Sequence, residues 1–505
     1  MRYFFLFITG MLLSIQAAAI DFEVNNMRYR VLEDSSQSVR LVQTITPDAD
    51  GVVAVPDEVQ YQGTTYRVSE IGSLAFYMLE AEKLLIGKNV LAIAGDAFTL
   101  SMLRRIDVDG SNKAFQSEDG VLYSSGYRIL VRYPNMREDV SFALNPATEE
   151  IEAGAMADCP YLEEVSIPEG VRIIGDEAFY DDNNLSLIVI PSTVEEVGVD
   201  AFAGTAWLAS RDSGSLYCGN HVLALWKGPL PSDGVIEVAD DCLTIARGFD
   251  FSGLLGTLRI PAGVMKVGKR YRHIMNYEVA SENMVYRTTD GVLMSKDGTI
   301  LELYPGGREG AYVVPQGVIS VADDAFAEVP QLTRIMLPEG VEKIGARAFS
   351  QCLALERVDL PASLREIGDR AFDLRLVELP TAFPIMKAQN EEGLGAFPTV
   401  FCRAVNPPAA HVNTFLRNEG TSSTLYVPMG AADAYRSTLP WSEFDEIIEM
   451  DFADVDGNNV VNGSDVTALY DVLLNGGEAP ASADVDGNGV VNGSDVTTLY
   501  NRLLK

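Results

Sequence analysis

The chain reads Leu-Glu-Glu-Val-Ser-Ile-Pro-Glu-Gly-Val-Arg-Ile-Ile-Gly-Asp-Glu-Ala-Phe from Leu162 to Phe179, and a close variant follows from Leu185 to Phe202. The matching proline, glycine and phenylalanine residues of these two copies are twenty-three residues apart. A fixed period in the twenties is typical of a leucine-rich-repeat solenoid, in which each repeat packs only on its neighbours. The same spacing continues through Pro315, Pro338 and Pro361 and through Phe326, Phe349 and Phe372.

Two parts of the repeat predict its local structure. The segment L-x-x-[IV]-x-[IL], as in Leu332, Ile335 and Leu337, predicts a short strand with a buried face. Proline then ends the strand, because it has no N–H to donate to a ladder. We expect the glycine that follows, Gly345 or Gly368, to allow a tight bend.

The Ala-Phe pair that closes each repeat predicts a buried ladder. Since equivalent positions of stacked coils lie above one another, we expect Phe326, Phe349 and Phe372 to stack inside the solenoid. Further members of the series are Ala75 with Phe76, Ala97 with Phe98, and Ala155 with Met156.

The array is interrupted and closed by other patterns. Asp-Gly between apolar residues at 119–123 and 290–294 predicts hairpin turns, and residues 216–220 carry a weaker version. The stretch from Leu425 through Trp441 to Phe444 predicts a cap, because the open end of a solenoid would expose its core.

The repeat has Pro where the standard leucine-rich repeat has Asn or Cys, and it resembles the BspA-like (treponemal-type) leucine-rich repeat with its I-P-x-x-V-x-x-I-G-x-x-A-F motif. The resemblance covers roughly residues 67–379. It implies a mainly β solenoid in a secreted or surface-exposed protein associated with adhesion to host or matrix proteins. The family offers no catalytic residues to carry over.

The C-terminal segment contains a second, shorter duplication. Residues 454–465 read Asp-Val-Asp-Gly-Asn-Asn-Val-Val-Asn-Gly-Ser-Asp, and residues 484–495 repeat them with one change. Calcium takes six to eight oxygen ligands, and EF-hand loops supply them from positions 1, 3, 5, 7, 9 and 12. The sequence therefore predicts two calcium ions, held by Asp454, Asp456, Asn458, the Val460 carbonyl, Asn462 and Asp465, and by Asp484, Asp486, Asn488, the Val490 carbonyl, Asn492 and Asp495.

Each loop leads into a predicted amphipathic helix. Position 6, which needs a positive φ, is Asn459 in one copy and Gly489 in the other. Both loops end in Asp where a general EF-hand has Glu. Apolar residues follow at helical spacing, and we expect the two stripes to be buried against each other or a neighbour: Val466, Leu469, Tyr470, Leu473 and Leu474, and Val496, Leu499, Tyr500, Leu503 and Leu504.

This loop–helix pair resembles the type I dockerin. The resemblance implies a small all-α calcium-binding module that binds a cohesin module and so attaches the chain to a multi-protein or cell-surface assembly. It also implies that loop positions 10 and 11 and the helix choose the partner, which predicts a partner surface of Gly463, Ser464, Tyr470, Gly493, Ser494 and Tyr500. The near-identity of the two copies favours docking in two orientations. The alternative is a calcium-stapled cap without a partner.

These patterns predict five parts: a signal peptide at 1–19, an N-terminal cap at 20–66, repeats with hairpin insertions at 67–379, a C-terminal cap region at 380–450 and the calcium module at 451–505. Arg2, an apolar run and three alanines at 17–19 are typical of a secretory signal. No segment is long and apolar enough to span a bilayer. We therefore expect a bacterial protein that is secreted or held at the cell surface.

Composition narrows the function further. The net charge of −34 argues against a nucleic-acid partner, and dispersed acidity is more simply a solubility feature than a cation-binding one. The five cysteines form no C-x-x-C pair, which favours core thiols over a disulfide framework. They are Cys159, Cys218, Cys242, Cys352 and Cys402.

The sequence shows no motif for catalysis. It lacks a G-x-S-x-G elbow, H-E-x-x-H, a Walker loop and G-x-G-x-x-G. Its three histidines, His221, His273 and His411, are more typical of surface or core positions than of general bases. A carboxylate pair of the glycosidase type stays open on sequence alone. We expect a non-catalytic protein that binds protein or glycan ligands through its repeats; the alternative is a component of a polysaccharide-degrading, cellulosome-like complex.

Overall fold

The computed structural model describes residues 21–32, 37–44, 46–247, 256–269, 271–375, 397–418, 420–458, 460–475, 479–488 and 490–504. The predicted signal peptide at 1–19 lies outside these described residues. The chain divides into two compact units, Met1–Arg211 and Asp212–Lys505.

The first unit opens with a mixed sheet of strand order β1-β2-β3-β6-β5, in which β9 also pairs with β6. A second sheet has the order β11-β8-β4, and β10 pairs with β7. These strands are β1 (Asp21–Val24), β2 (Met27–Val31), β3 (Ser38–Thr44), β4 (Val52–Val55), β5 (Glu58–Tyr61), β6 (Thr64–Ile71), β7 (Glu80–Ala81), β8 (Lys83–Ile86), β9 (Ala92–Ile93), β10 (Met102–Leu103) and β11 (Ile106–Val108).

The rest of the first unit consists of stacked coils. One sheet runs β12-β13-β14-β16-β18-β20 and a second runs β15-β17-β19. Their bounds are β12 (Phe115–Glu118), β13 (Val121–Ser124), β14 (Ile129–Arg132), β15 (Ser141–Ala143), β16 (Glu150–Ile151), β17 (Glu164–Ser166), β18 (Ile173–Ile174), β19 (Leu187–Val189) and β20 (Glu196–Val197), with the short helices η1 (Ser125–Tyr127) and α1 (Ala206–Ala209).

The second unit begins with two further sheets, ordered β21-β22-β24-β26 and β23-β25-β27. The strands are β21 (Gly214–Cys218), β22 (Val222–Lys227), β23 (Val235–Glu237), β24 (Thr244–Ile245), β25 (Gly256–Ile260), β26 (Lys266–Val267) and β27 (Ile274–Val279).

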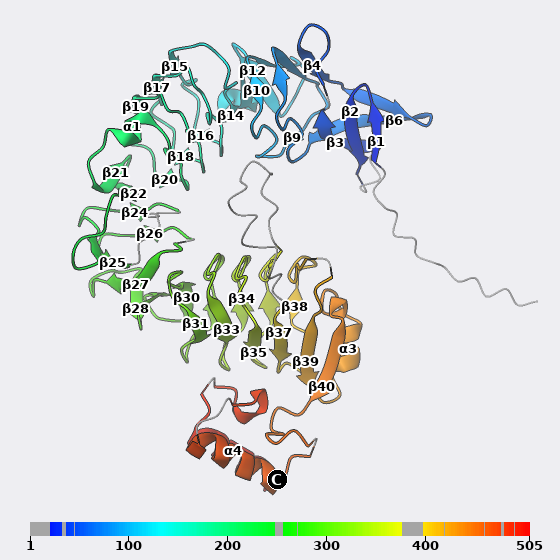
Figure 1. Ribbon diagram of the computed structural model, residues 1–505, viewed down its shortest axis with the longest axis vertical. Helices are drawn as coiled ribbons and strands as arrows, with labels where there is room; N and C mark the ends of the chain where they lie inside the picture. Colours follow the sequence, from blue (N-terminus) through cyan, green and yellow to red (C-terminus); the bar gives the residue numbers. More distant parts are fainter. Residues whose placement is uncertain are drawn as a thin grey trace, which may run out of the picture. The chain divides into compact units, whose positions relative to one another are not determined.

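The C-terminal coils of the second unit form two ladders, β28-β29-β30-β32-β34-β36-β38 and β31-β33-β35-β37-β39-β40, and Figure 1 shows their short strands side by side. The bounds are β28 (Tyr286–Thr289), β29 (Val292–Ser295), β30 (Ile300–Leu303), β31 (Gly310–Val313), β32 (Ser320–Val321), β33 (Leu332–Met336), β34 (Lys343–Ile344), β35 (Arg357–Leu360), β36 (Glu366–Ile367), β37 (Thr399–Cys402), β38 (Ala409–Ala410), β39 (Thr424–Pro428) and β40 (Glu446–Met450).

In the regular coils, the register of the parallel strands equals the sequence period. Val165 of β17 pairs with Ile188 of β19, and Ile335 of β33 pairs with Val358 of β35. Each pair is separated by one repeat length, so one repeat is one coil. The prediction of a mainly β leucine-rich solenoid is confirmed.

The predicted phenylalanine ladder is present in the core of the second unit. The ring centroids of Phe326 and Phe349 are 4.9 Å apart, and those of Phe349 and Phe372 are 5.0 Å apart. Tyr304 and Phe415 extend the stack at its two ends. Such contacts add to the hydrophobic stabilisation that burial of the rings provides.

The reason for the repeat glycine differs from our expectation. A Cβ on Gly345 would lie 2.4 Å from the Asp323 backbone nitrogen, and one on Gly368 would lie 2.5 Å from that of Ala346. Glycine is therefore required by the close approach of the preceding coil, and the bend is made two residues later. The residues with left-handed backbone there include Arg347 and Arg370, with φ of 52° and 53°.

The predicted hairpins interrupt the coils as expected. β12 pairs antiparallel with β13, β28 with β29, and β21 with β22. The turn residues Asp119 and Gly120 have φ of 47° and 79°, the positive values that a two-residue hairpin turn needs.

The end of the solenoid is closed by buried aromatic residues. Helix α3 (Ala432–Arg436) and the 3-10 turn η2 (Trp441–Glu443) bring Tyr435 and Trp441 into the same core as the phenylalanine ladder. The Trp441 indole donates to the Pro408 carbonyl at 2.8 Å, and the Tyr435 hydroxyl donates to that of Ala404 at 2.7 Å. These rings are therefore packing residues of the predicted cap.

All five cysteines are free, and all but Cys218 are buried. Burial raises the pKa of Cys352 to about 12 and that of Cys402 to about 11. Thiols held in this state are unreactive core residues, as the sequence indicated.

Candidate calcium sites in the C-terminal module

The C-terminal module brings the six predicted carboxylate ligands together in two groups. Asp454, Asp456 and Asp465 form one group, and Asp484, Asp486 and Asp495 form the other. Within each group one oxygen of every carboxylate lies within 4.8 Å of the others. Loop positions 1, 3 and 12 therefore converge in both loops.

Backbone amides fix the last carboxylate of each loop. Asp465 accepts hydrogen bonds from the Val455 nitrogen at 2.7 Å and from the Asn462 nitrogen at 2.7 Å. Asp495 accepts from the Asp486 nitrogen at 3.2 Å and from the Asn492 nitrogen at 2.7 Å. The shorter Asp side chain at position 12 thus ties the start of its helix to the start of its loop.

The amide side chains at positions 5 and 9 lie within the loops. Their oxygens accept backbone hydrogen bonds: Asn458 from the Val460 nitrogen at 2.9 Å, and Asn462 from the Ser464 nitrogen at 2.7 Å. The Asn462 amide also donates to the Val460 carbonyl at 3.0 Å. Asn488, Val490 and Asn492 repeat these contacts in the second loop. The position-6 residues, Asn459 and Gly489, lie outside the described residues.

The electrostatics of the two groups fit a divalent cation. Three carboxylates at such short separations repel one another, and a bound cation with two positive charges offsets most of that repulsion. Burial raises the pKa of Asp495; backbone hydrogen bonds from Asn492 and Asp486 oppose this, and the neighbouring carboxylates add a smaller increase. An all-oxygen donor set of carboxylates, amides and a carbonyl suits a hard cation such as calcium.

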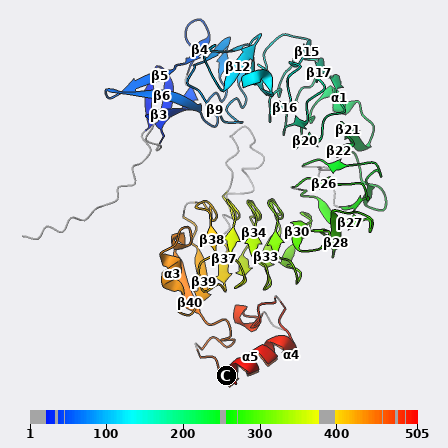
Figure 2. The ribbon, with the colours of Figure 1, turned by 180° about the vertical axis from the view of Figure 1, so that it is seen from behind.

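The two helices of the module pack through part of the predicted stripes. Helix α4 (Gly463–Asn475) and helix α5 (Gly493–Leu503) contribute Val466, Leu469, Val496 and Leu499 to a small buried core, and Figure 2 shows the two helices together. The 3-10 turn η3 (Ala481–Ala483) adds Ala483.

Of the remaining stripe residues, Leu473 packs partly buried against this core and the others are exposed, which corrects our expectation that the stripes are buried. Tyr470 and Tyr500 are 44% and 46% exposed, and Leu474, Leu503 and Leu504 also face solvent. The helices are too few and too short to cover both sides of each stripe. They leave an apolar face on each copy of the module.

The residues predicted to choose a partner differ in their surroundings. Gly463 and Gly493 begin the two helices. The Ser464 hydroxyl donates to Asp456 at 2.5 Å, and the Ser494 hydroxyl donates to Asp486 at 2.6 Å. Both serines therefore belong to the calcium loops, whereas Tyr470 and Tyr500 lie on the exposed faces.

Sequence reasoning missed the contacts between the second loop and the repeats. Gln316, Glu339 and Arg403, which we call the seat, hydrogen-bond to the backbone of that loop. The seat residues come from three different coils. Nothing in their local sequence marks them as contacts of a loop that follows much later in the chain.

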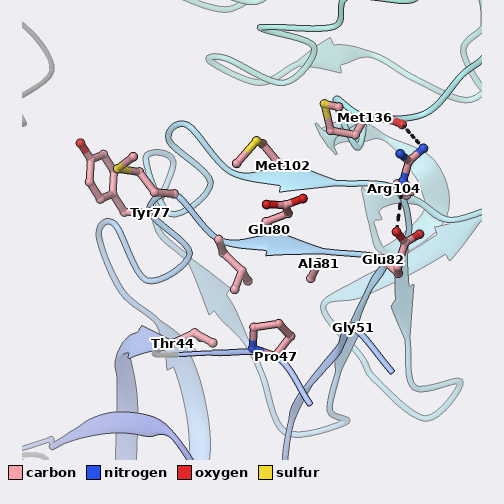
Figure 3. A pocket seen from close by; sticks show the side chains of 12 residues that line it. Thr44, Pro47, Gly51, Tyr77, Glu80, Ala81, Glu82, Met102, Arg104 and Met136 are labelled. Carbon is pink, nitrogen blue, oxygen red and sulfur yellow. Dashed lines mark hydrogen bonds and ion pairs between the residues drawn. The ribbon is translucent and has the colours of Figure 1, made fainter. Parts of the chain in front are cut away.

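The first unit carries a separate surface pocket of about 520 Å³. Figure 3 shows Met102, Met136 and Glu80 on its wall, with Arg104 pointing to Glu82. Arg104 pairs with Glu82 at 3.4 Å and with Glu138 at 2.8 Å. The pocket combines flexible apolar side chains with acidic ones, and its cation is already paired.

Two family models match parts of the chain. The BspA type leucine rich repeat region matches six copies within residues 135–214 and 311–387, and the dockerin type I domain matches residues 452–504. No curated protein matches the chain.

Several solved structures resemble this chain over most of its length. A leucine rich cell surface protein from Faecalibacterium prausnitzii is 16% identical with a TM-score of 0.31, and the match covers 89% of this chain and 97% of that one. The pneumococcal vaccine antigen PcpA is 18% identical with a TM-score of 0.28, covering 86% and 99%. A leucine-rich repeat protein from Bacteroides ovatus is 16% identical with a TM-score of 0.24, covering 86% and 100%.

The solenoid and the paired loops define a repeat protein with a C-terminal loop–helix module. In particular, the chain carries BspA type leucine rich repeats and a type I dockerin domain. No helix in the described part of the chain has both the length and the apolar content that crossing a bilayer requires.

Proposed function

We propose that this chain is an exported, non-catalytic binding protein that is docked through its C-terminal module. The repeats present a surface for a protein or glycan ligand, and the module attaches them to a cohesin-bearing assembly or cell surface. The signal-like segment at 1–19 supports export. Calcium at the two loops orders the module for docking, as metal binding does in other small modules.

The observation that carries this proposal is the convergence of three carboxylates in each of two near-identical loops. A module that only capped the solenoid would have no need for exposed apolar faces. Tyr470 and Tyr500 occupy equivalent positions on these faces, and exposed aromatic rings are common anchors in protein interfaces.

Calorimetry on the full chain tests the calcium sites, and we expect two ions per chain. Binding to immobilised purified cohesin modules, with calcium and with a chelator, then tests docking. A chain that ends at Met450 is the control and should bind no cohesin. Calcium uptake without binding to any cohesin of a broad panel would favour the capping role.

The non-catalytic part of the proposal has its own test. Incubation of the purified chain with a panel of plant and host glycans should release no soluble sugar. Product release that scales with the amount of protein would replace the proposed role with that of an enzyme in a polysaccharide-degrading complex.

A further inference from the structure

The second calcium loop rests on the seat through its backbone carbonyls. The Arg403 guanidinium donates to the Asp484 carbonyl at 2.6 Å, and the Glu339 nitrogen donates to the Gly487 carbonyl at 3.2 Å. The Gln316 side-chain amide donates to the Asn488 carbonyl at 3.1 Å. Loop positions 1, 4 and 5 are thus held from outside through their carbonyls, while the Asp484 carboxylate stays in the carboxylate group.

The seat itself is held in place by the repeats. Gln316 and Glu339 are one repeat length apart and follow the prolines of successive coils. The Glu339 carboxylate accepts from the Ala362 nitrogen at 2.7 Å and from the Ser363 nitrogen at 3.2 Å, in the next coil. These contacts tie Glu339 to the next coil of the solenoid.

Arg403, a member of the seat, makes three contacts with the module. Besides its bond to the Asp484 carbonyl, its guanidinium lies 3.8 Å from the Asp484 carboxylate and 4.8 Å from the centre of the Phe452 ring. Its side chain is only 14% exposed. The Arg403 hydrogen bond goes to the carbonyl of Asp484, while the carboxylate of Asp484 accepts from the Asn488 nitrogen at 3.0 Å within the loop.

The two loops are therefore unequal although their sequences are nearly the same. Gly457 of the first loop is exposed, whereas the equivalent Gly487 is buried. A Cβ on Gly487 would lie 3.3 Å from the Glu339 Cγ, whereas one on Gly457 would meet nothing within 4 Å. The two glycines have the same backbone, with φ of 73° and 71°.

We propose that calcium in the second loop fixes the module to the repeats, with Arg403 as the positioning residue, and that the first loop binds calcium independently of the repeats. This inference rests on the proposed calcium binding. The seat bonds to carbonyls whose spacing is set when the loop closes around its ion. The seat therefore binds the loaded loop better than the open loop, and by linkage it raises the calcium affinity of that loop.

Single-loop variants of the full chain test the proposal by calorimetry. Asp456→Ala leaves only the second loop able to bind calcium, and Asp486→Ala leaves only the first. Arg403→Ala should weaken calcium binding about fivefold in the Asp456→Ala chain, the effect of losing about one hydrogen bond. It should leave the affinity unchanged in the Asp486→Ala chain.

Arg365→Ala is the matched control, because Arg365 is an exposed cation of the same repeats that pairs with Glu342. It should change neither affinity. If Arg403→Ala has no effect on the second loop, or weakens both loops equally, the proposal is wrong. If the wild-type chain binds no calcium at all, the proposed function itself is wrong. This outcome differs from the previous two, in which the wild-type chain binds calcium but Arg403 does not act on the second loop alone.

The two equivalent glycines provide a second test that does not depend on charge. Gly487→Ala and Gly457→Ala carry the same backbone strain, but only the former pushes against Glu339. Hydrogen exchange followed by mass spectrometry should show calcium-dependent protection of the peptide that contains Glu339. Gly487→Ala should remove that protection and Gly457→Ala should keep it. Equal protection in both variants, or protection that ignores calcium, would overturn the coupling.

Discussion

The hydroxyl of Ser464 donates a hydrogen bond to the carboxylate of Asp456 at 2.5 Å. This bond is the main cause of the lowered pKa of Asp456. A residue predicted to choose the partner thus supports a predicted calcium ligand. We therefore expect loss of this serine to lower the calcium affinity of the loop.

We expect Ser464→Ala with Ser494→Ala to weaken calcium binding at both loops by a few-fold, because each loop loses a donor to its position-3 carboxylate. Calorimetry with calcium measures the effect. Thr467→Ala is the control, since the Thr467 hydroxyl donates to the Gly463 carbonyl and not to a ligand. Unchanged calcium affinity with loss of cohesin binding would instead assign the serines to recognition.

The exposed tyrosines give a prediction about docking alone. Tyr470→Ala with Tyr500→Ala should weaken cohesin binding by at least about tenfold, since anchors of this type often contribute more than ~1.4 kcal/mol. Calcium affinity should not change, because neither ring is in a loop. Each single variant should keep most of the binding if the module docks in two orientations. Wild-type binding by the double variant would exclude these faces as the docking surface.

The close coil contact at Gly345 predicts a loss of stability on substitution. A methyl group there would overlap the Asp323 backbone, and overpacking of this kind costs about 1–3 kcal/mol. Urea unfolding of the full chain, followed by circular dichroism, measures the change. Gly95→Ala is the control, because a Cβ at Gly95 meets nothing within 4 Å. Equal stability of the two variants would contradict the close-approach explanation.

The buried carboxyl of Asp182 predicts a pH dependence of the first unit. Burial, opposed by a hydrogen bond from the Cys159 nitrogen, raises its pKa from 3.8 to about 8. Of the groups that face it, Asp158 and Asp181 raise this pKa further, and Arg132 lowers it. The folded state therefore holds the proton more tightly than the unfolded state does. Its stabilising contribution is complete below about pH 4 and is lost as the pH rises to about 8.

Asp182→Asn should remove this part of the pH dependence and raise the free energy of unfolding at pH 8 by several kcal/mol, since a shift of about four pKa units corresponds to roughly 6 kcal/mol. The asparagine oxygen keeps the bond from the Cys159 nitrogen, so the packing is preserved. Urea unfolding of both chains across this pH range provides the comparison. Parallel pH profiles for the wild type and the variant would show that Asp182 titrates normally.

Much of the fold follows from one periodicity. The spacing of Phe326, Phe349 and Phe372 anticipated both the register of the strands and the stacked rings. The two carboxylate groups of the module could also be predicted from the sequence, because the members of each group lie within one short loop. In both cases the contacts join residues whose separation is fixed by a local or repeating pattern.

The features that escaped prediction depend on backbone placement. The close approach at Gly345 arises where two coils touch, and its sequence signal is the same as that of a turn glycine. The bond between Gln316 and Asn488 joins residues 172 positions apart that share no period. Exposure of Tyr470 depends on which neighbours are available to cover it. None of these relations is encoded in spacing or residue type.

The equality of register and repeat length has a consequence for how such a chain varies. Deleting or duplicating one whole coil leaves every remaining side chain pointing as before, whereas an insertion of any other length must leave the stack as a loop. Relatives of this protein should therefore have solenoids whose lengths differ by whole numbers of coils. Changes of partial length should gather at the hairpins near Gly120 and Gly291.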